Sequence, residues 1–198
     1  RDARNRLRDL ATQVGARVDD QLETIEGLLV AIAEGASSDT AAIDRNDAIL
    51  GRLREELPPY ITHLALWSND GRNIGTSDAD PLRARKMEVA AHRFFREALA
   101  ATHLTVGRPI ESRESGGWSL TMARRIRHDG AIVGVASVSA RLDSLARFLA
   151  VGAAGRSSII ITLVDDDGTL LARAGGRPIV VGTRVSTPTV EPGDGAGT

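Results

Sequence analysis

The side chains best suited to chemistry in this sequence gather between positions 118 and 139. A guanidinium, two hydroxyls, an indole and a thioether alternate there with small residues, at Trp118, Met122, Arg124, Ser137 and Ser139. A guanidinium binds a carboxylate through two parallel hydrogen bonds, and hydroxyls both donate and accept. Apolar walls with a few polar groups are typical of a pocket for a small molecule. The pattern therefore indicates a binding site for a small polar ligand.

Catalytic and metal-binding patterns do not occur in the sequence. The four histidines, His63, His92, His103 and His128, are scattered and lack the spacing of zinc ligands. The segment Asp165–Gly168 lacks the alternating acids and the distant glutamate of a calcium loop, so it is interpreted as a turn. No G-x-S-x-G nucleophile motif is present. We therefore expect no catalytic residue, no enzyme activity, no metal and no cofactor.

Composition narrows the class of protein further. The 198 residues suffice for one large domain or slightly more, and 42% of them are hydrophobic. A net charge of −1 argues against nucleic acid as the main partner, because binding phosphates needs a surplus of Lys and Arg. The absence of cysteine excludes disulfides. No apolar run approaches the ~18 residues of a membrane span, and the start within a helical pattern is what an excised fragment would show.

A β-hairpin must position the candidate residues. Two strand-like runs flank Asp129-Gly130, which is a strong signal for a two-residue hairpin loop. That loop pairs Ile126 with Val133, Arg124 with Val135, Met122 with Ser137, and Leu120 with Ser139. One face of the hairpin then carries small side chains that would accept a helix: Thr121, Ala123, Gly134, Ala136, Val138 and Ala140. The opposite face holds the candidate pocket, and a three-residue loop would place Arg125 there instead of Arg124.

Other elements are predicted on both sides of this hairpin. Apolar residues at three- and four-residue steps predict one long helix from Arg1 to about Glu34. Its length favours a signalling stalk that begins near a membrane or pairs with a second copy, although an ordinary surface helix is the alternative. Before the hairpin we predict a helix that Asp39 or Thr40 caps and Pro58 ends, a strand at 60–68 with a return strand at 73–77, a helix at 83–101 and a strand before Pro109. After the hairpin we predict a short helix at 143–151, a linker at 152–156, a second hairpin at 158–173 and a frayed end at 191–198.

The order of these elements resembles the Cache family, the PAS-like extracytoplasmic sensor domains of bacterial histidine kinases, diguanylate cyclases and chemoreceptors. The resemblance rests on 92–99, Val106–Ile110, Trp118–Ile126, Asp129-Gly130 and Gly134–Leu145. The segment 163–173 is similar to the first hairpin of the second domain in tandem members. No single motif is specific, but the order and spacing together cover most of the chain.

The resemblance also implies further ligand contacts. The amino-acid-binding branch carries an Arg-x-aromatic-aromatic pattern, which here places His92 at the arginine position, Arg93 one residue out of register, and Phe95 as the second aromatic. The same branch has an aspartate for the ligand amine where this chain has Ser139, which carries no charge. These departures favour a small carboxylate over an α-amino acid. Arg108 and Trp67 complete the expected ligand contacts. For Phe94 and Phe95 a place in the core is favoured over ligand contact, because a helix packed on a sheet needs apolar side chains.

The sequence thus predicts an α+β fold: a PAS-like antiparallel sheet with a long N-terminal helix packed on one face, plus the start of a second similar domain. We divide it into a stalk helix (1–35), a membrane-distal sensor domain (36–151) and a linker with a partial second domain (152–198). The implied function is sensing of a small molecule outside the cytoplasm by a membrane-anchored receptor, dimeric through the N-terminal helix. A structural or dimerisation module that binds nothing is the main alternative, and an intracellular PAS domain with a cofactor is a more distant one.

Overall fold

The computed structural model describes residues 2–37, 39–111, 117–144, 160–175 and 180–185. The described elements, in chain order, are α1 (Asp2–Gly35), a 3-10 turn η1 (Thr40–Ala42), α2 (Ile43–Glu56), β1 (Ile61–Ser68), β2 (Asn73–Thr76), α3 (Pro81–Ala84), α4 (Arg93–Ala100), β3 (Thr105–Val106), β4 (Ile110–Glu111), β5 (Trp118–His128), β6 (Ala131–Arg141), β7 (Ile161–Val164) and β8 (Leu170–Ala174). The fold is α+β, as the sequence predicted.

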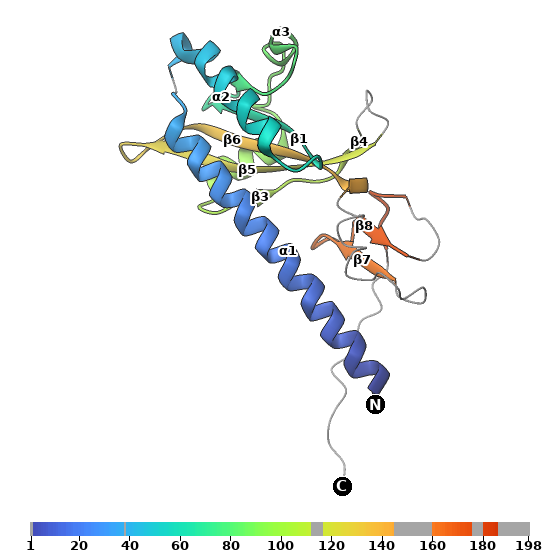
Figure 1. The fold of residues 1–198 in the computed structure, drawn as a ribbon. Helices are drawn as coiled ribbons and strands as arrows, with labels where there is room; N and C mark the ends of the chain where they lie inside the picture. Colours follow the sequence, from blue (N-terminus) through green and yellow to red (C-terminus); the bar gives the residue numbers. More distant parts are fainter. Residues whose placement is uncertain (1, 38, 112–116, 145–159, 176–179, 186–198) are drawn as a thin grey trace.

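The long helix α1 confirms the expected N-terminal element. It runs for 34 residues and buries Ile25, Leu29 and Ile32 on the sheet, while its N-terminal part extends beyond the sheet (Figure 1). The buried positions follow the apolar stripe at helical spacing. Gly35 ends the helix, and Asp39 accepts a hydrogen bond from the backbone N–H of Ala41 to start the next helical segment, as predicted.

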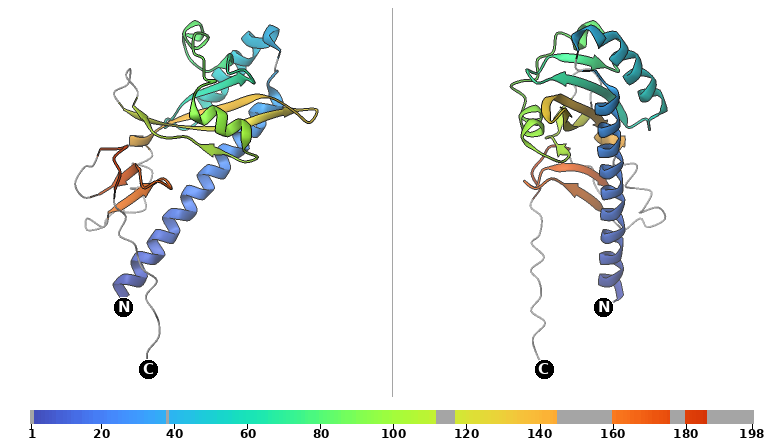
Figure 2. Two further views of the ribbon diagram at one scale, coloured as in Figure 1. Left: turned by 180° about the vertical axis from the view of Figure 1, so that it is seen from behind. Right: turned by 90° about the vertical axis from the view of Figure 1, so that its left-hand side faces the viewer.

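An antiparallel sheet lies between two helical layers. Its strand order is β2-β1-β6-β5-β3, with β4 also paired to β5. Helices α1 and α2 cover one face, where their side chains pack on a cluster that includes Leu64, Met122 and Val138. Helix α4 covers the other face with Phe94, Phe95 and Ala98. The two further views show the sheet between these layers (Figure 2).

The predicted Asp129-Gly130 turn is confirmed, but the strand register predicted beyond the turn differs from the observed one by one residue. Asp129 and Gly130 both have positive φ, 49° and 82°, as a type I′ turn requires. The pairs next to the turn follow the prediction, but a bulge between Ile126 and Arg127 then shifts β5 by one position.

The shifted pairs place Ile126 opposite Gly134, Arg124 opposite Ala136, Met122 opposite Val138, and Leu120 opposite Ala140. Since side chains alternate between faces, the two candidate serines now lie opposite Ala123 and Thr121, on the other face from Met122 and Arg124. The small residues of β6 therefore share one face, as predicted, but the β5 residues predicted to lie beside them, Thr121 and Ala123, lie on the opposite face. Gly134 marks the irregularity, because a Cβ atom there would lie 2.1 Å from the Trp67 carbonyl oxygen.

The single helix expected at 83–101 is two separate helices. Asp80 caps the short helix α3, which has Pro81 at its first position, and α4 starts only at Arg93. Between them the chain pairs with the β1–β2 turn, since the Val89 N–H donates to the Gly71 carbonyl at 3.1 Å. A tertiary hydrogen bond thus replaces helical ones in this segment.

The second hairpin is confirmed as a separate two-stranded sheet of β7 and β8. It contacts the main sheet through an apolar cluster in which Leu171 packs against Leu120 and Leu142. The predicted linker at 152–156 and the end at 191–198 lie outside the described residues, as does the short helix at 143–151 apart from its first two positions. Within the described part of the chain, no helix combines the length and apolarity needed to cross a membrane.

Candidate ligand-binding site

The structure separates the predicted ligand contacts from one another. Met122 and Arg124 face α1, and Trp67, Phe95, Ser137 and Ser139 lie on the α4 side of the sheet. Arg93 and Arg108 lie on a groove beside the second hairpin, which Met122 also reaches, and Trp118 packs near this hairpin. His92 is an exposed residue at the start of α4, and its ring lies edge-on to that of Phe94, with the ring centroids 5.9 Å apart. The register shift between β5 and β6 thus separates a set of residues that the sequence analysis placed together.

Arg124 is engaged by α1 rather than by an open pocket. Its guanidinium forms an ion pair with Glu26, and the backbone N–H of Leu104 donates to the same carboxylate at 3.2 Å. Both side chains of the pair are less than a third exposed. The expectation that Arg124 shares a pocket with Ser137 and Ser139 is therefore wrong.

The α4 side of the sheet is packed with aromatic and aliphatic side chains. The Trp67 indole N–H donates to the Ser137 hydroxyl at 2.9 Å, and Phe95 is 2% exposed. Burial lowers the pKa of His63 on the same face, with Asp78 opposing that effect and Arg83 adding to it. The hydrogen bond to Ser137 therefore satisfies the buried indole N–H of Trp67. Ser139 lies opposite His63 at the edge of this packed region.

A groove of about 420 Å³ lies where α1, the loop after β3 and the second hairpin meet. Its apolar wall includes Leu22 and Ile25 of α1, with Met122 and Leu120 of β5. The charged side chains of the groove come from Arg93 and Glu97 of α4, from Arg108, and from the acidic turn Asp165–Asp167. The volume lies within the range of small-molecule sites, about 300–1,000 Å³. Three predicted contacts, Arg93, Arg108 and Met122, line this groove.

Each arginine of the groove is paired with a carboxylate. Arg93 Nε lies 2.5 Å from Glu97 Oε1, and an Arg108 nitrogen lies 2.6 Å from Asp167 Oδ2. The bond with Glu97 is the main cause that raises the pKa of Arg93, and Asp167 and Asp165 act in the same direction. Burial alone would raise the pKa of Asp165, but hydrogen bonds from Thr169 and the Asp167 N–H, with the charge of Arg108, hold it below its usual value. The groove is thus an apolar cleft with cations and anions side by side.

This arrangement can bind a molecule with an apolar body and a charged end. An incoming carboxylate can take the place of Asp167 at Arg108, since the existing pair is solvent-exposed and contributes little by itself. Among the described residues, no group of three or more His, Asp or Glu side chains could hold a metal ion. The groove residues themselves supply charge pairing and apolar contact.

Sequence reasoning missed several residues of the groove. Gln21 and Tyr60, whose hydroxyl hydrogen-bonds to the Gln21 side chain, lie on the α1 side, and Glu97 is one turn after Arg93. The i,i+4 spacing of Arg93 and Glu97 was a readable signal for an ion pair. The contact between Asp167 and Arg108 joins residues 59 positions apart, and no local pattern indicates it.

Solved structures with a similar fold are sensor domains. The sensor domain of the histidine kinase DctB of V. cholerae matches with a TM-score of 0.65 and 16% identity, over 85% of this chain and 66% of that one. The ligand-binding domain of the chemoreceptor PctC of Pseudomonas aeruginosa, in complex with GABA, matches with a TM-score of 0.63 and 21% identity, over 87% and 76%. The sensory domain of the chemoreceptor Tlp3 of Campylobacter jejuni, with isoleucine bound, matches with a TM-score of 0.65 and 18% identity, over 83% and 68%.

These matches define the class of fold. The chain has the fold of the sensor domains of bacterial histidine kinases and chemoreceptors, so the resemblance to Cache domains is confirmed at the level of the fold. No protein-family model matches the chain. The chain spans about two thirds of the DctB sensor domain, so these proteins extend beyond the part that it covers.

Proposed function

We propose that this chain is the extracytoplasmic ligand-sensing part of a membrane-anchored bacterial receptor and is not itself an enzyme. The observation that carries the proposal is the fold it shares with sensor domains whose structures hold isoleucine or GABA. The proposed division is the one predicted from the sequence, with a stalk at 1–35, a sensor domain at 36–151 and a partial second domain from 152.

The proposed ligand is a small carboxylate, and the proposed site is the groove beside the second hairpin. Arg108 and Arg93 would bind the carboxylate, while Leu22, Ile25 and Met122 would contact the apolar part of the ligand. Guanidinium groups suit this role because they bind a carboxylate in a planar, two-pronged geometry. The acidic turn Asp165–Asp167 lies within the same groove and would exclude ligands that carry several negative charges.

The groove also suggests how binding changes the receptor. Its walls come from α1 and from the second hairpin, so a ligand held between them would alter the position of α1 relative to that hairpin. A ligand shifts such an equilibrium only by its differential affinity for the two arrangements. The helix would pass that shift to the membrane and the output domain.

The alternative is a structural module that dimerises and binds nothing. The filled face under α4, where Trp67 and Ser137 satisfy each other, favours that interpretation for that side of the sheet. It does not account for the open groove with two arginines.

Isothermal titration calorimetry with a panel of mono- and dicarboxylic acids tests the proposed function. We expect at least one acid to bind, and Arg108→Gln to weaken that binding by about 10- to 100-fold, the usual effect of losing a hydrogen bond to a charged group. Arg96→Gln is the matched control, because Arg96 is exposed on α4 and does not line the groove. If none of the acids in the panel binds, the proposal is contradicted.

A further inference from the structure

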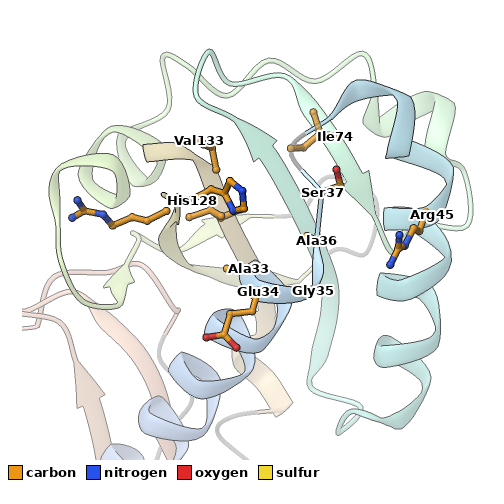
Figure 3. Close-up of a pocket in the computed structure, with 11 residues that line it drawn as sticks. Ala33, Glu34, Gly35, Ala36, Ser37, Arg45, Ile74, His128 and Val133 are labelled. Carbon is orange, nitrogen blue, oxygen red and sulfur yellow. The ribbon is translucent and has the colours of Figure 1, made fainter. Parts of the chain in front are cut away.

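A second cavity of about 420 Å³ lies at the far end of the sheet from the second hairpin. Its lining comes from separate elements: the last turn of α1 with Ala33, the following Ser37, Arg45 of α2, Ile74 of β2 and the tip of the β5–β6 hairpin with His128 (Figure 3). We call it the distal pocket. None of the predicted ligand contacts lines it.

The floor of the distal pocket is aliphatic and firmly held. Ile74 and Ile126 are 2% and 6% exposed, and Val133 packs beside them. Asn46, which is fully buried, fixes the neighbouring wall because its amide donates to the carbonyls of Ile74 and Ser37, at 2.8 and 2.9 Å. The pocket is therefore bounded by backbone that is fixed by hydrogen bonds rather than by a loose loop.

The charged side chains around this floor are mostly cationic. Arg45 and Arg127 lie on different elements, and Glu34 is the acidic side chain of the lining. An Arg127 nitrogen donates to the Gly130 carbonyl at 2.6 Å, which leaves its other N–H groups available. Arg45 forms no hydrogen bond or ion pair within the described part of the chain, unlike Arg85, Arg108 and Arg124, which are each paired with a carboxylate.

We propose that the distal pocket binds a small monocarboxylate through Arg45. The apolar body of the ligand lies on Ile74, Ile126 and Val133, and the carboxylate accepts hydrogen bonds from the Arg45 guanidinium, with Arg127 adding positive potential. A dicarboxylate is disfavoured, because its second charge would be desolvated on the aliphatic floor without a partner. This site is separate from the groove and makes the domain responsive to a second ligand.

Methyl NMR of the 198-residue chain with labelled isoleucines tests this inference, with butyrate, benzoate and succinate as probes. Ile74 and Ile126 report on the distal pocket, and Ile25 reports on the groove. We expect butyrate or benzoate to shift the Ile74 and Ile126 signals in a saturable way. Arg45→Gln should weaken this binding tenfold or more, whereas Arg52→Gln, an exposed control on the same helix, should leave it unchanged.

The same titration separates this inference from the proposed function. Shifts confined to Ile25 would support the groove and overturn the distal pocket. Shifts at Ile74 and Ile126 that persist unchanged in Arg45→Gln would overturn the role of Arg45, and succinate binding as tightly as butyrate would overturn the ligand class. If neither butyrate nor benzoate shifts the Ile74 and Ile126 signals, the proposal that the distal pocket binds a monocarboxylate is overturned. The calorimetric panel tests the groove independently of that result.

Discussion

His63 is a titratable side chain enclosed on the α4 side of the sheet. It lies in β1 with its ring 3.4 Å from the Thr76 hydroxyl, and burial lowers its pKa from the ordinary value of 6.5. The unfolded chain therefore takes up a proton at this residue at a higher pH than the folded chain does. By linkage, stability is greatest above about pH 6.5 and falls as the pH decreases toward the lowered pKa of the folded state.

We expect the free energy of unfolding to decrease between pH 7.5 and pH 5.5, by at most about 1.4 kcal/mol per pH unit for one proton. His63→Gln should reduce this dependence, because it removes the group that titrates differently in the two states. Urea unfolding at several pH values measures the effect. Equal slopes for the wild type and His63→Gln would contradict the prediction.

At the scale of elements, one carboxylate connects α1 to two parts of the sheet. Glu26 pairs with Arg124 of β5 and accepts the N–H of Leu104, which directly precedes β3. The chain continues from there into Val106 and Arg108 on the groove. Movement of this segment on ligand binding would therefore be transmitted to the helix through Glu26.

Glu26→Gln should destabilise the protein by roughly 1–3 kcal/mol, because Arg124 is left partly buried without a counter-charge. Glu23→Gln changes an exposed glutamate on the same helix and should have an effect within about 0.5 kcal/mol. Chemical denaturation of both variants measures the difference. If the two variants unfold alike, Glu26 does not hold α1 to the sheet.

The strand register of β5 shows which features of the sheet can be predicted from neighbouring residues and which cannot. Asp129-Gly130 requires a turn with positive φ, and this requirement is local, so the sequence was sufficient to predict it. The bulge beyond Ile126 depends on how closely β1 approaches Gly134, which is a contact between distant strands. This contact moved Arg124 and the two serines to opposite faces, and it could not be derived from the alternation of residues alone.

At the scale of the whole molecule, the N-terminal part of α1 extends away from the sheet (Figure 1). Leu7 in this part is 56% exposed and Val14 and Val18 are half-buried, whereas Leu10 on the same stripe is 8% exposed. An apolar stripe on a helix that the sheet does not cover is suited to packing against a second copy. The dimer predicted from the sequence would form through this part of the helix.

Sedimentation velocity tests this inference. We expect a dimer at micromolar concentrations and above, and Leu7→Glu should shift it toward the monomer because it places a charge in the apolar interface. Leu82→Glu is the matched control, since Leu82 is 75% exposed on α3 and away from the stripe. A chain that sediments as a monomer at every concentration would rule out dimerisation through α1 alone.

Apolar periodicity, capping residues and Asp-Gly turns act over a few positions, so the residues alone were enough to predict α1, α2, the hairpin turns and the class of fold. They were not enough to predict the break between α3 and α4. Leu29 on the buried stripe of α1 and Asp39 at the start of the next helix were readable in this way. Which arginines face a cavity depends instead on contacts between distant segments. Arg108 meets Asp167, and Arg124 meets Glu26, through contacts between segments 59 and 98 residues apart. Such pairs depend on strand register and on the packing of whole elements, and no local preference of the chain encodes them.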